Sequence, residues 1–340
     1  MILHSLVTGG AGFIGSHLCE RLLGEGHRVT AIDDFSTGSR ANVAHLASHD
    51  RFELVEGTVL DEALMERLIA RAQRVFHLAS AVGVRLIMEQ PVKTIETIFN
   101  GSDVVLRHCA AHHTRVVITS TSEVYGKGVA IPFREDEDTR SGATSKHRWA
   151  YACAKALDEF LALAHFKESR LPVAIVRLFN TVGPRQTGQY GMVVPRFVGA
   201  ALRNEPLIVY GDGLQARCFA HVLDVVEGLS RILEQEACLG KVTNLGTDEE
   251  ITINDLAARI VEVTGSRSRI DHVPYEAVYG DGFEDMLRRV PSLERARELI
   301  GYLTRRDLRS IIQDVAASMR GANNPEQAGR ELPRSSVTAR

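Results

Sequence analysis

The segment VTGGAGFIGSHL, residues 7–18, constrains the fold of this chain more than any other stretch. It joins an apolar stretch, residues 5–9, to an amphipathic one, residues 13–25, which predicts a strand, a tight turn and a helix. Its glycines satisfy both the G-x-x-G-x-x-G and the G-x-G-x-x-G spacings and are Gly9, Gly10, Gly12 and Gly15. Glycines in this pattern let the backbone approach a pyrophosphate at the N-terminus of the helix.

Apolar strands alternate with amphipathic helices through the first half of the chain. The predicted strands are residues 5–9, 28–33, 52–57, 74–79, 115–120 and 172–178, and the predicted helices are residues 13–25, 61–71, 91–112 and 149–168. This order predicts an α/β fold with a Rossmann-type, doubly wound parallel sheet. Ligands of such sheets bind at the C-terminal ends of the strands.

Asp33 ends the strand that follows the glycine loop. An acid at this place accepts hydrogen bonds from the adenosine ribose hydroxyls of a dinucleotide. The same carboxylate would repel a 2′-phosphate, so we expect NAD rather than NADP.

The regular alternation ends after the strand at 172–178, where a Gly- and Pro-rich stretch predicts a loop over the ligand. We expect residues 1–178, with a return segment at about 219–247, to form the NAD-binding domain. Residues 179–218 and 248–320 should form a smaller C-terminal α/β domain that binds the substrate. The tail at 321–340 is polar and is predicted to be disordered, because it has too few apolar residues to bury.

Composition bounds the setting and the partners. A net charge of −3 over 340 residues gives no reason to expect nucleic acid or a membrane as a partner. Five cysteines without a C-x-x-C spacing suit a reducing compartment with buried thiols. No apolar run is long enough to span a bilayer, the start has no signal-peptide pattern, and the histidines lack metal-ligand spacing. We expect a cytoplasmic protein without a metal.

Tyr151 and Lys155 are four residues apart in WAYACAK, which places them on one face of a helix. The ordinary pKa of tyrosine, near 10, is too high for a base at neutral pH. A neighbouring ammonium and the positive nicotinamide ring both favour the phenolate, and bringing its pKa to about 7 takes roughly 4 kcal/mol. Tyr151 would then take a proton from a substrate alcohol held by the hydroxyl of Thr121 or Ser122, while hydride passes to NAD.

Several stretches together resemble the extended short-chain dehydrogenase/reductase family, and within it the nucleotide-sugar epimerases and dehydratases. They are TGGAGFIGSHL, HLASAVG, STSEVYG, YACAK, RLFNTVGPRQ, VYGDGLQARCFAHVLDVV and GFEDMLRRVPSLERARELIGY. The resemblance implies bound NAD, oxidation of a UDP-sugar at C4, chemistry on the ketone, and return of the hydride. It also implies a homodimer paired through the helices at 91–112 and 149–168.

Position by position, the resemblance also implies roles for single residues. The implied catalytic residues are Thr121, Ser122, Glu123, Tyr151 and Lys155. The implied cofactor-binding residues are Tyr151 and Lys155 again, with Gly9, Gly12, Phe13, Ile14, Gly15, Asp33, Thr58, Val59, Leu78 and Ala79. The implied substrate-binding residues are Arg85, Thr121, Asn180, Arg185, Met192, Val193, Tyr210 and Arg217. Thr58 departs from the family pattern, which usually has an aspartate near the adenine.

The segment STSEVYG separates the reactions of the family. In the 4,6-dehydratases the motif at this place resembles Ser-Thr-Asp-Glu, and its aspartate protonates the leaving hydroxyl. This chain has Ser122 at that place, and serine is a poor acid, so dehydration is not expected. In the UDP-glucuronate decarboxylases the motif resembles Ser-Thr-Ser-Glu, which matches residues 120–123 of this chain. By this resemblance Glu123 matches the acid of those enzymes and Arg217 matches their arginine.

Two other features favour a 4-epimerase. Decarboxylases of this type usually carry an arginine near GMVV, where this chain has Met192, and a Pro-containing loop after HLAS, where it reads AVGVRLIMEQP. Methionine cannot pair with a carboxylate, so a uronic acid would need another cation such as Arg85 or Arg185. The expectation is an NAD-dependent C4-epimerase of a UDP-hexose or UDP-hexuronate, acting through a transient 4-keto sugar. UDP-glucuronate decarboxylase and a catalytically inactive NAD-binding regulator remain open alternatives.

Overall fold

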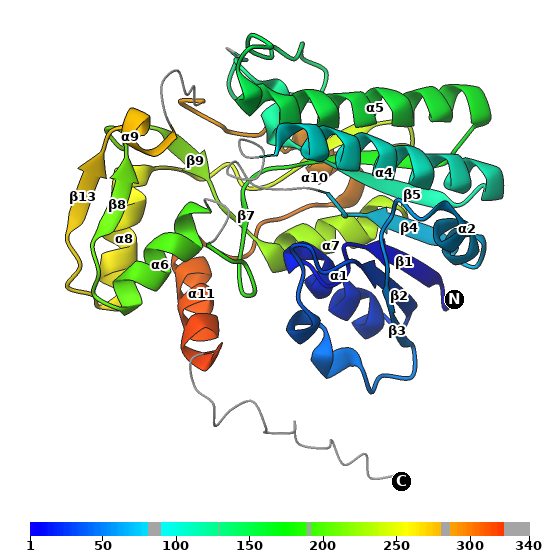
Figure 1. The fold of residues 1–340 in the computed structure, drawn as a ribbon, viewed down its shortest axis with the longest axis horizontal. Coiled ribbons are helices and arrows are strands. Elements are labelled where there is room, and N and C mark those ends of the chain that lie inside the picture. Colours follow the sequence, from blue (N-terminus) through cyan, green and yellow to red (C-terminus); the bar gives the residue numbers. More distant parts are fainter. Residues whose placement is uncertain (81–89, 129, 189–191, 280–285, 323–340) are drawn as a thin grey trace.

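The computed structural model describes residues 1–80, 90–128, 130–188, 192–279 and 286–322. A seven-stranded parallel sheet with the order β11-β6-β5-β4-β1-β2-β3 forms the centre of the molecule (Figure 1). Its strands are β1 (His4–Thr8), β2 (Arg28–Asp33), β3 (Phe52–Glu56), β4 (Arg74–His77), β5 (Arg115–Thr121), β6 (Val173–Leu178) and β11 (Val242–Leu245). The Rossmann-type sheet expected from the sequence is confirmed.

The direction of winding reverses at β1, which pairs with β2 on one side and β4 on the other. In register, Thr8 at the end of β1 is the partner of Ile32 and of His77, so these strands end side by side. A crevice outside the strand ends at such a switch point is the usual ligand site of an open α/β sheet.

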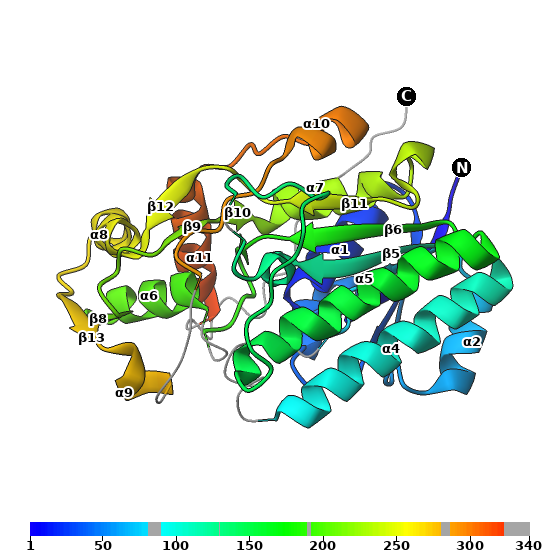
Figure 2. The same cartoon turned by 90° about the horizontal axis from the view of Figure 1, so that it is seen from above.

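Helices cover both faces of the sheet (Figures 1 and 2). One face carries α2 (Glu62–Ala70), α4 (Pro91–His112) and α5 (Ala150–Ser169). The other carries α1 (Phe13–Gly24), α7 (Val222–Ile232) and α10 (Glu294–Ile300). Because the strands are covered on both sides, they read in the sequence as continuous apolar runs rather than as alternating ones.

A smaller group of elements lies beside the sheet, at the end toward which the strands point (Figure 1). Its core is formed by α6 (Val193–Leu202), α8 (Ile253–Thr264) and α11 (Leu308–Ala322) against the parallel pair β8 (Leu207–Tyr210) and β13 (Ile270–Val273). Helix α8 is capped by Thr252, whose hydroxyl accepts a hydrogen bond from the Asp255 N–H.

Short elements complete the chain and connect the two groups. Two-residue strands β7 (Thr181–Val182) and β10 (Ala220–His221) pair in parallel, and β9 (Ala216–Cys218) pairs antiparallel with β12 (Glu250–Thr252). Helix α9 spans Tyr275–Tyr279, and the 3₁₀ turns are η1 (Arg40–Asn42), η2 (Ala44–Leu46), η3 (Ser122–Tyr125), η4 (His147–Trp149) and η5 (Glu236–Cys238).

Two expectations are tested by single features. None of the helices in the described ranges is both long and apolar enough to cross a bilayer. Four cysteines are buried, but Cys153 on α5 is exposed, so the expectation of buried thiols is wrong at that position. Arg85 and the tail from residue 323 onward lie outside the described residues.

Candidate functional site

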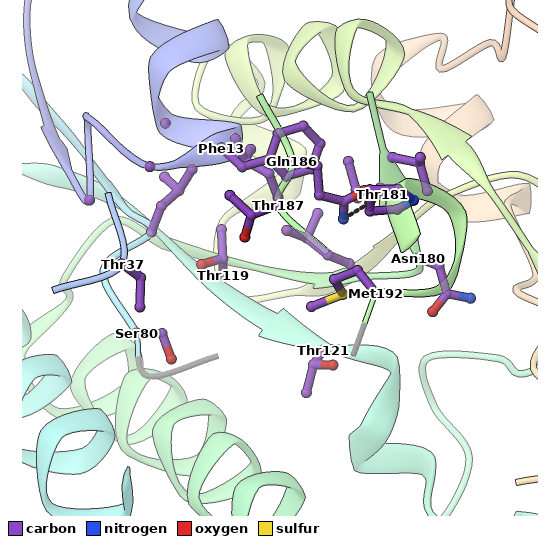
Figure 3. A pocket seen from close by; sticks show the side chains of 18 of the residues that line it. Phe13, Thr37, Ser80, Thr119, Thr121, Asn180, Thr181, Gln186, Thr187 and Met192 are labelled. Carbon is purple, nitrogen blue, oxygen red and sulfur yellow. Dashed lines mark hydrogen bonds between the residues drawn. The ribbon is translucent and has the colours of Figure 1, made fainter. Parts of the chain in front are cut away.

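A pocket of about 1130 Å³ lies beyond the C-terminal ends of β1, β4, β5 and β6, between the sheet and the smaller group of elements. Every predicted site residue within the described ranges lines it, so the structure brings together segments from the whole length of the chain. Figure 3 shows Thr121, Asn180 and Met192 around this cavity, with Phe13 and Gln186 on the side of helix α1.

The glycine loop forms the floor of the pocket below helix α1. Gly9 has a φ of +67°, and a Cβ on Gly15 would lie 2.1 Å from the Gly9 carbonyl oxygen, so neither position accepts a larger residue without movement. Gly12 precedes α1 and gives it no side-chain cap, so the N–H groups of the first turn can bind a diphosphate. Phe13 and Ile14 line the pocket from that same turn.

Asp33 closes one end of the loop. Its carboxylate accepts hydrogen bonds from the backbone N–H of Ala11, at 2.9 Å, and of Phe35, at 2.8 Å. Burial raises the pKa of Asp33, and these backbone hydrogen bonds oppose the rise. Thr58 and Val59 follow strand β3 and line the pocket near this carboxylate, where an adenosine would lie.

The loop after β4 forms the facing wall. The N–H groups of Leu78 and Ala79 both donate to the Thr8 hydroxyl oxygen, at 3.2 and 3.1 Å. A Cβ on Gly9 would come within 2.9 Å of the Ala79 nitrogen, so this wall lies directly against the glycine loop. An uncapped helix end, a glycine floor and an acid together fit a dinucleotide such as NAD.

The predicted catalytic residues meet where β5 ends. Thr121 is the last residue of β5, and its hydroxyl accepts a hydrogen bond from the Glu123 N–H at 3.2 Å. Tyr151 lies near this hydroxyl, which acts to lower the pKa of the phenol. Burial, followed by the Glu123 charge, raises the pKa of Tyr151 in the protein alone. Lys155 lies one turn further along α5 and is almost completely buried.

Glu123 lies between two buried guanidinium groups. Its Oε2 is 2.6 Å from Nη1 of Arg148, and its Oε1 is 2.6 Å from Nη2 of Arg289. Burial alone would raise the pKa of Glu123, but the charges of Arg289 and Arg148 outweigh burial and bring that pKa to about 2. At neutral pH Glu123 is therefore a carboxylate held by two cations, and it is not a proton donor.

Arg148 and Arg289 were not among the residues predicted from the sequence, although both line the pocket. Arg148 is three residues before Tyr151, within one turn of the catalytic segment, and that spacing could have revealed it. Arg289 lies in the stretch LRRVPS just before α10 and reaches Glu123 only through the fold. No local pattern in the sequence connects Arg289 with Glu123.

The predicted substrate ligands line the opposite side of the pocket. Asn180 follows β6 and donates its amide to the Cys218 carbonyl at 3.1 Å. Arg217 on β9 is buried and donates to the carbonyl of Ala216 at 2.8 Å. Arg185 pairs with Glu20 of helix α1, so the structure directs this guanidinium toward α1. The remaining predicted ligands that line this side are Met192, Val193 and Tyr210.

Comparisons with known proteins agree with the geometry of the site. Residues 5–246 match the NAD dependent epimerase/dehydratase family. The UDP-N-acetyl-alpha-D-glucosaminuronate decarboxylase of Bacillus cytotoxicus is 43% identical over 298 residues, which cover 87% of this chain and 91% of that protein. The UDP-glucuronic acid decarboxylase 1 of Arabidopsis thaliana is 35% identical over 332 residues, which cover 97% of this chain and 73% of that protein.

Among solved structures, a UDP-glucuronic acid 4-epimerase of Bacillus cereus, in complex with UDP-glucuronic acid and NAD, matches with a TM-score of 0.85. It is 25% identical, and the match covers 94% of this chain and all of that one. The family match spans most of the chain and includes the glycine loop, the β5 end and the Tyr151 helix. The chain thus belongs to the NAD dependent epimerase/dehydratase family, and its cofactor is NAD.

Proposed function

We propose that this chain is an NAD-dependent decarboxylase of a UDP-linked hexuronic acid. The observation that carries the proposal is the pair of buried arginines, Arg148 and Arg289, which bracket Glu123 beside Tyr151. Two curated relatives that match most of the chain are named as decarboxylases of such sugars. Together these observations favour the alternative left open by the sequence over the 4-epimerase that the sequence favoured.

The first step is oxidation of the sugar at C4. Bound NAD supplies the hydride acceptor for this carbon. Tyr151 takes the proton of the C4 hydroxyl, Thr121 holds that oxygen by a hydrogen bond, and Lys155 favours the phenolate form of the tyrosine. The glycine loop and Asp33 line the same pocket as Tyr151 and would hold the cofactor there.

The second step is loss of the carboxylate. A ketone at C4 makes the C6 carboxylate part of a β-keto acid, so the C5–C6 bond breaks, carbon dioxide leaves, and the electron pair passes to the enolate with its charge on O4. The nearby guanidinium groups offset the negative charge that remains in the site. A proton from water then adds to C5, the hydride returns to C4 and Tyr151 returns its proton to O4, which gives a UDP-pentose.

The buried arginines also offer a cation in place of the arginine that is missing at Met192. A uronate carboxylate needs a cation, and the methionine near GMVV cannot provide one. We propose Arg289 as this cation, because its side chain lines the pocket and its guanidinium lies beside Glu123. Arginine suits this role because its planar donors bind two carboxylate oxygens at once.

The matched pair Arg289→Met and Arg288→Met tests this assignment. We expect Arg289→Met to lower carbon dioxide release from UDP-hexuronates by about 10²-fold or more, because one buried charge-stabilising donor is lost. Arg288 is exposed and pairs with Glu250, so Arg288→Met should stay within about twofold of wild type. Equal rates for the two variants would remove the observation on which the proposal rests.

A 4-epimerase is the second candidate. The similarity to the UDP-glucuronic acid 4-epimerase of Bacillus cereus and the methionine at 192 favour it. An epimerase uses the same Tyr151 and Lys155 but keeps the carboxylate, so its product has the mass of the substrate. Product mass therefore separates the two candidates directly.

We also propose a homodimer, as the resemblance implies. Helices α4 and α5 lie side by side and expose apolar side chains that a globular monomer would usually bury. These residues are Val92 and Ile95 on α4 and Leu157 and Phe160 on α5. Pairing these helices with those of a second copy would bury all four.

The division of the chain into domains is likewise a proposal. Residues 1–178, with the return segment at 219–247, contain all seven strands of the main sheet. The separate core around α6, α8 and α11 is built mostly from residues 179–218 and 248–320. This distribution supports an NAD-binding domain and a substrate-binding domain with those bounds.

A further inference from the structure

The catalytic lysine has a buried carboxylate as its partner. The Nζ of Lys155 lies 3.1 Å from Oδ2 of Asp158, one turn further along α5. Asp158 is completely buried and Lys155 is 2% exposed. Burying two charges is costly unless they pair, so this pair is fixed in place by the surrounding structure. None of the steps described above uses Asp158.

A chain of buried hydrogen bonds supports Asp158 from the other side. Nδ1 of His77 lies 2.9 Å from the Thr8 hydroxyl, and Nε2 of His77 lies 3.3 Å from the Ser102 hydroxyl. Burial raises the pKa of Asp158, and the charge of Lys155 and the nearby Ser102 hydroxyl oppose that rise. Burial, and then the charge of Lys155, lowers the pKa of His77 to about 3, so this histidine is neutral.

The direction of this chain follows from its donors and acceptors. The Thr8 oxygen accepts two backbone N–H groups, from Leu78 and Ala79, so its single proton must go to Nδ1 of His77. The one ring proton of His77 is then on Nε2 and is donated to Ser102. The Ser102 proton is then not used by His77. This series of hydrogen bonds therefore ends near Asp158, whose Oδ2 accepts a hydrogen bond from Lys155.

The charges around Tyr151 give this carboxylate a role. Both acidic and basic groups surround Tyr151 and Lys155. The acids are Glu123 of η3 and Asp158 and Glu159 of α5, and the basic groups are Arg148 of η4, Arg289 and His77 of β4. Glu159 pairs with Arg177 of β6. Bound NAD adds the positive nicotinamide ring. Lys155 and the nicotinamide ring both favour the phenolate, and a phenol that stayed ionised could not return its proton to the sugar. The negative charge of Asp158 next to Lys155 acts in the opposite direction and favours the protonated phenol.

We propose that Asp158 is a positioning residue that holds Lys155 beside Tyr151 and offsets part of its charge, and so sets the pH at which Tyr151 ionises in the NAD-bound protein. The inference rests on the proposed function for the role of Tyr151 as base. It does not depend on which UDP-sugar is the substrate or on whether carbon dioxide is lost.

The test is a spectroscopic titration of Tyr151 without substrate. NAD-saturated protein is titrated by its tyrosinate absorbance, and the same titration of the matching Tyr151→Phe protein is subtracted. We expect Asp158→Asn to move the Tyr151 midpoint to lower pH by at least about half a unit, because a negative charge near the phenolate is removed. Asp158→Glu should restore a midpoint close to that of wild type.

Ser102→Ala is the matched control, because it perturbs the same buried cluster and leaves the Asp158 charge in place. Its midpoint should remain within about 0.3 units of wild type. If Asp158→Asn does not fold, Asp158→Ser, a smaller neutral side chain with room for water, should give the same downward shift. An unchanged or raised midpoint in the neutral variants, or an equal shift in Ser102→Ala, would overturn the proposal. Absence of carbon dioxide release would refute the proposed function and leave this titration intact.

Discussion

At Glu123, burial and charge act on one carboxylate in opposite directions. Burial would protonate it, and Arg289 and Arg148 keep it ionised with a pKa of about 2. The resemblance to decarboxylases made Glu123 an acid, and the structure instead makes it an anion that holds two guanidinium groups in the pocket. The residue type could be read from the sequence, but its protonation state could not, because it depends on a cation brought in by the fold.

This ion pairing predicts a pH-dependent stability. A carboxylate with a folded-state pKa below its ordinary value of 4.5 stabilises the fold above that pH, and the contribution is lost as the pH falls toward about 2. Glu123→Gln should therefore lower the free energy of unfolding most at neutral pH, by about 3 kcal/mol. Urea unfolding of both proteins at several pH values measures this. A difference that stays constant as the pH falls below 4 would contradict the assigned pKa.

The proposed reaction depends on Tyr151 as its base. Tyr151→Phe removes the base that takes the C4 hydroxyl proton, so turnover should fall by about 10²–10⁴-fold. The variant keeps the aromatic ring, and its NAD content and thermal unfolding should match wild type. Rapid kinetics with UDP-glucuronate, together with cofactor analysis of the purified protein, measure both. A variant that retains turnover would assign the proton transfer to another group.

At the scale of elements, the turn from β1 into α1 is the most constrained part of the fold. A Cβ on Gly15 would collide with the Gly9 carbonyl, whereas a Cβ on Gly24, at the other end of the same helix, would meet nothing within 4 Å. Gly15→Ala should therefore lose NAD binding and more than about 3 kcal/mol of stability. Gly24→Ala should change stability by less than about 1 kcal/mol. Calorimetry with and without NAD compares them, and equal effects would refute the close packing at Gly15.

The sequence predicted long elements well because their patterns are local. The six strands predicted for the first half and helix α4 have the expected bounds within two residues. The β7–β10 pair was not predicted, because a strand of two residues has no periodicity to detect. The contacts of Arg289 with Glu123 and of Arg185 with Glu20 were not predicted either, because each joins residues that are more than 150 positions apart in the sequence.

At the scale of the whole molecule, the exposed apolar faces of α4 and α5 predict an assembly. Phe160→Glu places a charge in the centre of the proposed interface, so the dimer should dissociate to a monomer at micromolar concentration. Leu303→Glu, at another exposed apolar side chain far from these helices in the sequence, should leave the dimer intact. Light scattering coupled to size exclusion measures both masses. A wild-type monomer, or dissociation by both variants, would contradict the proposed interface.

The candidate site lies between the two groups of elements, and the product released from it decides between the two candidate functions. The most direct measurement is NMR and mass spectrometry of the products that the purified protein forms from UDP-glucuronate and from UDP-N-acetylglucosaminuronate. If the protein is the proposed decarboxylase, at least one of the two sugars gives carbon dioxide and a UDP-linked pentose. A mixture of C4 epimers with unchanged mass would contradict this proposal and restore the epimerase that the sequence favoured.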